Sequence, residues 1–422
     1  MDDGGDRETT AASGSTTTTG TPSETTTPSD PAGETASVNG NDFAWPSLRA
    51  DPGNSGRSRV ATGPERTPGE SWSFSPPDAS GTGLTQYLPA VAEGTVYAPM
   101  HPDGETFGIY ALDAESGESE WAVEHTSEET SGARPLDDFG SAAVDEARVY
   151  ATDVDVVLAV GRDGTERWTS DAAVIVPRTM NDGVYGFGAP NDGDLGVIGL
   201  DAETGAVRTH WPADGSPVGV GFDAERAYVL EYASGSEALD IVAVSLADAT
   251  EVWRTTVNDH GEGVYPTFPV VHRDTVLVSK GPVLGDETVS QGVLAVDADT
   301  GRERWSVAVG PDADSNVGRI VAAEGRAHVV ERFALEPDAV RAYDLADGAL
   351  QWETTVDTAV GLGDGAFAAG DTLYVPGSPT LALSLADGTE RWRAEEGANA
   401  PFAAGVGAFY GPSPYGLRAY RP

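Results

Sequence analysis

The side chains that could catalyse a reaction or bind a metal form no recognised catalytic pattern in this sequence. Cysteine is absent, so a disulfide, a thiolate metal site and a cysteine nucleophile are all excluded. Neither the Gly-x-Ser-x-Gly turn of a serine hydrolase nor a phosphate-binding P-loop occurs. The six histidines lack the His-x-His and His-Glu-x-x-His spacings of a zinc site; they stand at positions 101, 125, 210, 260, 272 and 328.

Two kinds of segment imitate a ligand-binding loop. Residues 312–318, Asp-Ala-Asp-Ser-Asn-Val-Gly, have the alternating oxygen ligands of a calcium loop, but its twelfth position would be Ala323 instead of glutamate. We interpret them as an acidic turn between repeats. Residues 361–365 and 405–407 are glycine-rich, like nucleotide-binding loops. No helix follows to bring its N-terminus to a phosphate, so both are interpreted as turns between strands.

The charge of the chain limits its partners. Asp and Glu number 68 against 25 Lys and Arg, a net charge of −43, and Lys280 is the only lysine. Such a chain repels phosphate backbones and anionic membranes, which argues against nucleic acid as a partner. An acidic interaction surface would concentrate the charge in one tract, whereas here it is spread throughout. This composition resembles that of proteins from haloarchaea that accumulate salt.

The first 42 residues differ from the rest of the chain. They are rich in Thr, Ser, Pro and acids, and no aromatic residue precedes Phe43, so residues 1–42 are expected to be a disordered linker. The tract is similar to the tether that follows the lipid-modified cysteine of haloarchaeal lipoproteins, with a lipid anchor upstream of Met1. That predicts an extracellular, cell-surface location; the alternatives are a cytoplasmic protein and a tail without function. No stretch approaches 18 apolar residues, so no transmembrane helix is expected.

The elements that must position any site follow from an internal repeat of 40 to 52 residues. The repeats together contain eight tryptophans, and a phrase such as Leu294-Ala-Val-Asp-Ala-Asp-Thr-Gly301 precedes seven of them. Within this phrase apolar residues alternate with a small residue, which is the pattern of a strand. Gly then closes a tight hairpin in the left-handed conformation, and Trp lies on the returning strand. The tryptophans are Trp72, Trp121, Trp168, Trp211, Trp253, Trp305, Trp352 and Trp392. The small residues are Ala111, Ala159, Gly199, Ala243, Ala295, Ala342, Ala382 and Ala419.

A second column of residues, such as Val96-Tyr97 and Val149-Tyr150, precedes each phrase and indicates another strand. A turn signal and an apolar run before it supply a further strand. Each repeat is therefore four short antiparallel strands, which is one blade of a β-propeller. His328 occupies this column and is expected to be a buried strand residue rather than a ligand.

The number of blades follows from the two ends of the chain. The last repeat ends at Tyr420 without its own Trp strand, while Trp72 precedes the first complete repeat. Joining the N-terminal strand to the C-terminal three closes the ring and removes the unpaired sheet edge. This predicts an all-β, eight-bladed propeller of four-stranded blades over residues 43–422. The alternative is seven blades with a stray strand at each end.

The phrase Ala-x-Asp-x-x-Thr/Ser-Gly-x-x-x-Trp resembles the tryptophan-docking motif of pyrroloquinoline-quinone (PQQ)-type propellers. The resemblance implies that each Trp ring is held between the small residue of one blade and the Gly turn of its neighbour. Residues 45–56, which begin Trp-Pro-Ser-Leu-Arg, are similar to the lead-in before the first blade of such proteins. The family comprises quinone- and calcium-dependent dehydrogenases and also noncatalytic lipoproteins, such as the scaffold subunit of the outer-membrane β-barrel assembly machinery.

These observations favour a noncatalytic, monomeric cell-surface propeller of a halophile, which binds a protein or peptide through its rim loops or central funnel without a cofactor. The alternative is a quinoprotein dehydrogenase that uses PQQ and calcium. Many such alcohol dehydrogenases place a vicinal disulfide over the quinone, and this chain has no cysteine. No segment matches their catalytic Asp or calcium site, so we assign no catalytic, cofactor-binding or metal-binding residue.

Ala249 is an exception within the repeat, because five other repeats have Gly four residues before Trp. Either Ala249 is held in the left-handed region, at a cost on the order of 1 kcal/mol relative to Gly, or its turn has changed type.

The charge predicts that the folded state requires salt. At molar salt the Debye length falls to about 3 Å and self-repulsion is screened, so the melting temperature should rise between about 0.1 M and 3 M salt. Thermal unfolding followed by tryptophan fluorescence measures this, and an unchanged melting temperature would contradict the screening argument.

Overall fold

The computed structural model describes most of the chain from Phe43 onward. The described residues are 43–58, 60–77, 88–102, 106–126, 141–153, 156–191, 193–236, 238–258, 268–280, 292–309, 316–332, 338–356, 365–377, 379–394, 403–413 and 416–422. The expected linker, residues 1–42, lies outside them, as do residues 312–315 and 361–364 of the two loop-like segments.

The first four blades follow one another along the chain, each as one antiparallel sheet. Blade 1 is β3 (Ala90–Ala92), β4 (Thr95–Met100), β5 (Thr106–Asp113) and β6 (Ser119–Thr126). Blade 2 is β7 (Ser141–Val144), β8 (Arg148–Asp153), β9 (Val156–Gly161) and β10 (Glu166–Ser170). Blade 3 is β11 (Ala173–Met180), β12 (Gly183–Ala189), β13 (Gly196–Asp201) and β14 (Val207–Pro212). Blade 4 is β15 (Ser216–Phe222), β16 (Arg226–Tyr232), β17 (Leu239–Ser245) and β18 (Glu251–Asn258).

The last four blades repeat this order until the ring closes. Blade 5 is β19 (Val270–His272), β20 (Thr275–Lys280), β21 (Gly292–Asp297) and β22 (Glu303–Ala308). Blade 6 is β23 (Asn316–Ala323), β24 (Arg326–Arg332), β25 (Asp338–Asp344) and β26 (Leu350–Val356). Blade 7 is β27 (Phe367–Ala369), β28 (Thr372–Val375), β29 (Thr380–Ser384) and β30 (Glu390–Ala394). Blade 8 is β31 (Ala403–Gly405), β32 (Ala408–Ser413), β33 (Gly416–Arg421) and β2 (Gly69–Phe74).

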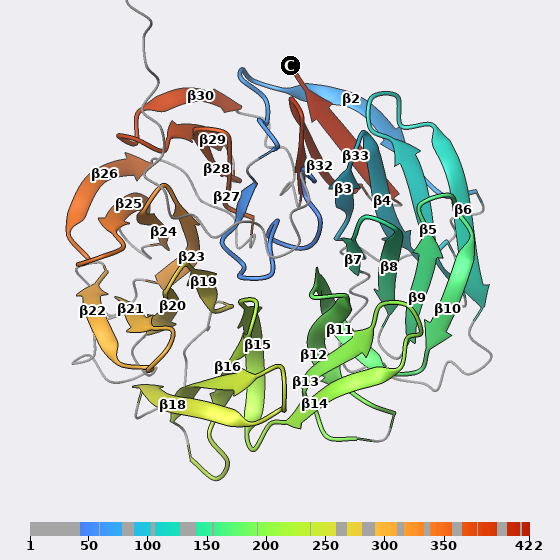
Figure 1. Ribbon diagram of the computed structural model, residues 1–422. Helices are drawn as coiled ribbons and strands as arrows, with labels where there is room; N and C mark the ends of the chain where they lie inside the picture. Colours follow the sequence, from blue (N-terminus) through green and yellow to red (C-terminus); the bar gives the residue numbers. More distant parts are fainter. Residues whose placement is uncertain are drawn as a thin grey trace, which may run out of the picture. The chain divides into compact units, whose positions relative to one another are not determined.

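The sheets are arranged in a ring, with the first strand of each blade innermost and the fourth outermost (Figure 1). The eight-bladed, all-β fold is confirmed, and the seven-bladed alternative is wrong. The closure is also as expected, because β2 pairs with β33 on the outside of the last blade. One addition was not foreseen: β1 (Arg57–Ser58) pairs in parallel with β27 and gives blade 7 a fifth strand.

The register within a blade explains the small residue of each repeat. In blade 1, Tyr97 lies opposite Ala111, and Ala111 lies opposite Trp121. Paired residues share one face of a sheet, so the alanine leaves room for the two rings, whose centroids are 5.9 Å apart. The hydrophobic core is therefore divided among the interfaces between blades. One cluster, for example, joins Ile109 of blade 1 to Leu158 of blade 2.

The two ends of the ring are built differently. One end, which we call the turn face, carries the short turns between the first and second strands of each blade and, in blades 1 to 7, those between the third and fourth strands. The opposite end, the loop face, is where the other connections leave the strands. These include residues 259–269 between β18 and β19 and residues 281–291 between β20 and β21.

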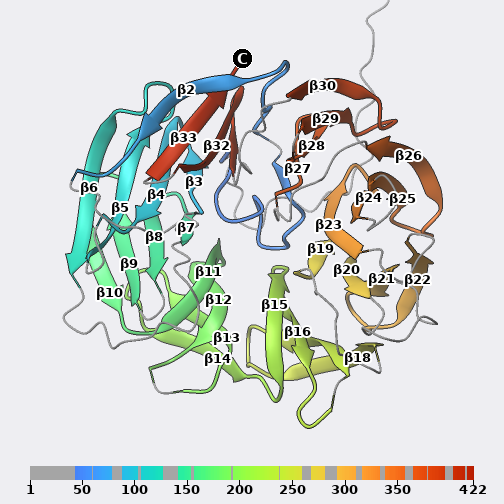
Figure 2. The same cartoon turned by 180° about the vertical axis from the view of Figure 1, so that it is seen from behind.

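Residues 43–64, which we call the axial segment, lie in the middle of the ring (Figures 1 and 2). Backbone hydrogen bonds join this segment to the innermost strands of seven blades, and a side-chain contact joins it to the remaining one, β11. Val144, Phe222 and Ala322, which bind it through their N–H groups, lie at or next to the last residue before the first turns of their blades. The segment therefore lies at the turn face, where it pairs backbone groups that the innermost strands would otherwise leave unpaired.

Asn54 is the hub of the axial segment. Its side chain is buried and donates from Nδ2 to the carbonyl oxygens of Val220 at 2.7 Å and Pro269 at 3.0 Å. Its Oδ1 accepts a hydrogen bond of 2.6 Å from Nη2 of Arg178, whose Nη1 binds the carbonyl oxygen of Pro177 at 3.1 Å. Burial lowers the pKa of Arg178 to about 10. One amide thus links the innermost strands of three blades.

This arrangement predicts that Asn54→Ala destabilises the protein by about 2–4 kcal/mol, because it removes the partner of the buried Nη2 of Arg178 and of two carbonyl groups. Asn181→Ala is the matched control. Asn181 also has a positive φ, 49° against 57° for Asn54, but it is exposed, and its Nδ2 donates to the carbonyl oxygen of Ala224 at the surface. Its loss should stay below about 1 kcal/mol in chemical denaturation. Equal losses for the two variants would contradict the role of Asn54.

Candidate functional site

The sequence-predicted residues meet at the contacts between neighbouring blades. Seven of the eight repeat tryptophans donate a hydrogen bond from Nε1 to a backbone carbonyl oxygen that lies beyond their own blade, counting the described residues alone. The bonds join Trp72 to Ala114 at 3.3 Å, Trp121 to Arg162 at 3.2 Å, Trp168 to Ala202 at 3.0 Å, Trp253 to Ala298 at 2.9 Å, Trp305 to Leu345 at 2.9 Å, Trp352 to Leu385 at 3.1 Å and Trp392 to Pro64 at 3.1 Å.

The turn glycine is needed at these contacts for two separate reasons. Gly117 has φ +74°, which a residue with a Cβ adopts only at a cost, and a Cβ there would lie 2.5 Å from the ring of Trp72. Gly301 is in the same position against Trp253, with φ +67° and a Cβ distance of 2.5 Å. The glycine therefore provides both the turn conformation and the space for the neighbouring indole.

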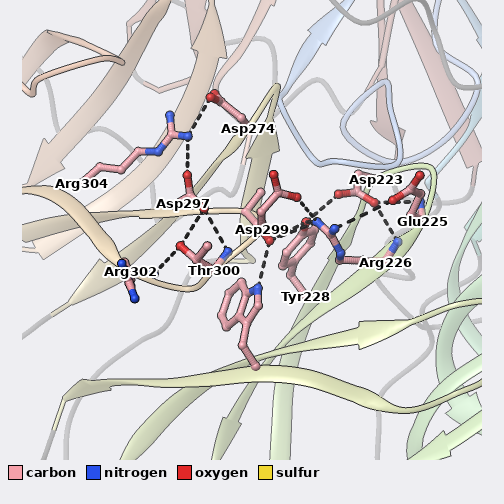
Figure 3. Close-up of polar contacts among 12 residues, drawn as sticks. Asp223, Glu225, Arg226, Tyr228, Asp274, Asp297, Asp299, Thr300, Arg302 and Arg304 are labelled. Carbon is pink, nitrogen blue, oxygen red and sulfur yellow. Dashed lines mark hydrogen bonds and ion pairs between the residues drawn. The ribbon is translucent and has the colours of Figure 1, made fainter.

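Figure 3 shows the polar contacts where blade 4 meets blade 5. Tyr228 donates to Oδ2 of Asp223 at 2.5 Å, in the first turn of its own blade, and its hydroxyl lies 3.4 Å from the carbonyl oxygen of Ala298. Arg226 reaches across to the same carbonyl at 3.2 Å and to Oδ1 of Asp299 at 2.8 Å. Burial and the nearby Asp223 carboxylate raise the pKa of Tyr228, so its hydroxyl remains a proton donor. One carbonyl thus accepts from the second and fourth strands of the preceding blade.

The aspartate of the repeat phrase holds the turn itself. Oδ1 of Asp297 accepts hydrogen bonds from the backbone N–H and the hydroxyl of Thr300 at 2.9 and 2.8 Å, and Oδ2 lies 2.7 Å from Nη2 of Arg304. These contacts, Arg304 first, lower the pKa of Asp297 to about 2. Arg304 also binds Asp274 at 2.7 Å (Figure 3). The same Asp-x-x-Thr/Ser contacts lower the pKa of Asp113 and Asp201, so this spacing favours the ionised turn carboxylate.

Blade 3 departs from the repeat at Thr209 and Trp211, and the blade 4 turn that Thr209 contacts departs from it at Ala249. Gly199 lies opposite Thr209 instead of Trp211. The hydroxyl of Thr209 donates to the carbonyl oxygen of Leu246 at 3.2 Å, the acceptor that an indole uses in other blades. Ala249 keeps the turn type, since its N–H binds the Ser245 oxygen at 3.0 Å with φ 54°. In this altered arrangement Ala249 packs against the hydrophobic cluster that contains Trp211 and Phe222.

The order of two side chains is reversed in blade 3. In blade 4, Trp253 is followed two residues later by Thr255, whose hydroxyl donates to the oxygen of Gly301 at 2.7 Å. Blade 3 has Thr209 first and Trp211 second. Both positions face the same side of the strand, so the exchange keeps the pattern of the sheet.

The closing blade lacks a turn between its third and fourth strands, because β33 ends at Arg421 and β2 begins at Gly69. Residues 62–64 of the axial segment replace it. Tyr374 donates to the carbonyl oxygens of Thr62 at 3.1 Å and Pro64 at 3.2 Å, and Pro64 also accepts from Trp392. Gly63, with φ +61°, packs against the Tyr374 ring as a turn glycine does. The sequence analysis did not predict that residues 62–64 take the place of this turn, although Gly63-Pro64 is a turn signal in the sequence.

The histidine in the tyrosine column is buried, as expected. His328 is 0% exposed, and its ring nitrogens lie 3.3 Å from the carbonyl oxygens of Val321 and Leu385. Burial lowers its pKa to about 4. Within the part of the chain that the structure describes, no group of three or more His, Asp or Glu side chains could hold a metal ion.

Comparison with known proteins agrees with this architecture. The family model described as outer membrane protein assembly factor BamB, with PQQ-type repeats, matches residues 65–172, 105–280, 191–336 and 336–411. The chain therefore belongs to the BamB-like family of PQQ-type β-propellers. No curated protein sequence matches the chain.

Solved structures share the fold at low sequence identity. A quinohemoprotein alcohol dehydrogenase from Comamonas testosteroni has a TM-score of 0.59 at 13% identity, over 89% of this chain and 80% of that one. BamB from Moraxella catarrhalis has a TM-score of 0.50 at 14% identity, over 84% and 100%. The computationally designed protein Ika8 has a TM-score of 0.58 at 12% identity, over 81% and 98%. Across the described ranges, no helix has the length and apolarity needed to span a membrane.

The geometry of Ala249 predicts that Ala249→Gly stabilises the protein by up to about 1 kcal/mol, because the left-handed residue loses its Cβ penalty. Ala346→Gly is the control, since Ala346 lies in the corresponding turn of blade 6 and is not among the positive-φ residues. That change should destabilise by a few tenths of a kcal/mol. Denaturant unfolding of both variants measures the difference, and destabilisation by Ala249→Gly would contradict the assignment.

Thr209 and Trp211 of blade 3 should also be energetically coupled to Ala249 of blade 4. Exchanging them in the double variant Thr209→Trp, Trp211→Thr places an indole against the Ala249 Cβ and should cost more than about 2 kcal/mol. Adding Ala249→Gly should recover at least about 1 kcal/mol beyond its effect alone. Strict additivity in the denaturation cycle would show that the residues do not constrain each other.

Proposed function

We propose that the protein is a noncatalytic propeller scaffold that binds a protein or peptide partner through its loop face. The observation that carries this proposal is the difference between the two ends of the ring. At the turn face, Trp and Arg side chains bind the adjacent blade, and Tyr and Asp side chains bind within their own blade. The axial segment covers the inner strand edges. The long connections, such as residues 281–291, leave from the opposite end.

The family membership and the composition support the setting of this role. The matching family model is described as an assembly factor of the outer membrane, and such a scaffold needs binding surfaces instead of catalytic groups. The net charge of −43 suits a protein that works in molar salt. The Thr/Ser/Pro-rich residues 1–42 suit a tether that holds the propeller at an extracellular cell surface. In this proposal the protein works as a monomer without a cofactor.

The proposal is tested by cross-linking the tagged protein on its own cells in at least 2 M salt, followed by mass spectrometry. Replacing residues 281–291 by a short Gly/Ser turn should remove the cross-links to a protein partner. Glu115→Arg, an exposed turn-face change, should leave them intact. Loss of the partner in the Glu115→Arg variant alone would place the binding surface at the other end of the ring.

A quinoprotein dehydrogenase is the second candidate, because the fold is also that of the Comamonas testosteroni alcohol dehydrogenase. The two functions are separated by incubating the purified protein with PQQ and calcium in high salt. The scaffold proposal expects no quinone absorbance to remain with the protein after gel filtration and no dye-linked alcohol oxidation. Retained quinone together with oxidation would overturn it in favour of the enzyme.

A further inference from the structure

Blade 4 contains two buried carboxylates side by side. Glu231 of β16 and Asp240 of β17 are directly opposite each other, and they are 0% and 6% exposed. Arg254 of β18 binds both: its Nη1 lies 2.6 Å from Oε1 of Glu231 and 3.3 Å from Oδ2 of Asp240. Because Arg254 also lies 2.8 Å from Glu251 and 3.9 Å from Asp214, one guanidinium is shared among four carboxylates.

Each buried carboxylate keeps one oxygen without a partner. Oε2 of Glu231 and Oδ1 of Asp240 are buried, and no hydrogen-bond donor among the described residues reaches either of them. A buried charged oxygen without a partner is unfavourable, and two on adjacent residues add mutual repulsion. Arg254 is occupied with the other oxygen of each carboxylate, so a cation bound to the two remaining oxygens would relieve their repulsion.

Blade 6 provides an internal comparison for this pair. Glu331 stands three residues after His328, as Glu231 stands three residues after Tyr228, and it is also 0% exposed. Both of its oxygens are bonded, one to Arg341 and one to the hydroxyl of Tyr343 at 3.3 Å. The residue opposite Glu331 is Ala339, where blade 4 has Asp240. The buried glutamate is therefore common to both blades, whereas the second carboxylate and the unpaired oxygens belong to blade 4.

We propose that Glu231 and Asp240 together bind a calcium ion between β16 and β17. Carboxylate oxygens are ligands that hard cations prefer, and calcium accepts irregular geometry with water in its remaining positions. Two protein carboxylates give a site of modest affinity, on the order of 0.1 to 1 mM. Thr256, which pairs with Asp240 on the outermost strand, is exposed, so this end of the sheet is reached from solvent. The site is independent of the proposed scaffold role.

The experiment is a calcium titration of the full-length protein, followed by calorimetry and by melting temperature. The ionic strength is held at 2 M with tetramethylammonium chloride, whose cation is too large for the pair. With 10 mM CaCl₂, the melting temperature of the wild type should rise by about 2 to 3 °C, and excess EDTA should reverse the rise. No calcium-dependent shift would overturn the proposal, as would an equal shift with 10 mM NaCl.

Two substitutions locate the site. Asp240→Asn should lower the calcium affinity at least about tenfold, since it removes one charged ligand. The matched control Glu331→Gln removes the corresponding buried carboxylate of blade 6 and should leave the affinity within about twofold of the wild type. If Asp240→Asn fails to fold, Glu231→Gln supplies the same test. An equal loss in the Glu331→Gln variant, or unchanged affinity in both blade 4 variants, would overturn the assignment.

Discussion

The contact on which the ring depends is the hydrogen bond from a tryptophan indole of one blade to a turn carbonyl beyond it. In Trp253, the indole reaches the oxygen of Ala298, and the same oxygen also accepts from Arg226. In most repeats this contact is accompanied by three features: a small residue under the aromatic rings, a glycine in the left-handed conformation, and an aspartate that holds the turn. A propeller has no single core, so these interfaces carry both packing and orientation between blades.

The exceptions follow the same constraint. In blade 3, Thr209 donates to the usual acceptor while Trp211 is displaced, and the turn then accommodates Ala249. At the closing blade, the two chain ends remove a hairpin, and Gly63 and Pro64 supply the missing glycine and carbonyl. The requirement for a donor, an acceptor and space is thus retained, although the residues that meet it differ.

The buried charges lie away from these repeated contacts. Arg178 is held near the middle of the ring through Asn54, and Glu231 and Asp240 lie within blade 4. In a chain with net charge −43, most carboxylates stay at the surface, where salt screens them. The few buried carboxylates need partners nearby. Both oxygens of Glu331 have such partners, whereas Oε2 of Glu231 has none among the described residues. The repeat thus allows a single blade to contain buried charged residues that the other blades do not share.

The sequence alone determined the strand order, the eight blades, the closure by the strand of Trp72 and the burial of His328, because each depends on a local period of two residues or on a turn glycine. The tertiary structure decided those features that no repeating sequence pattern signals. The axial segment binds all eight blades, and only the closed ring brings those strand edges to one place. The roles of Pro64, Asn54 and the Glu231–Asp240 pair likewise depend on partners far along the chain or on other strands. Their burial is a property of the assembled ring, which local spacing does not encode.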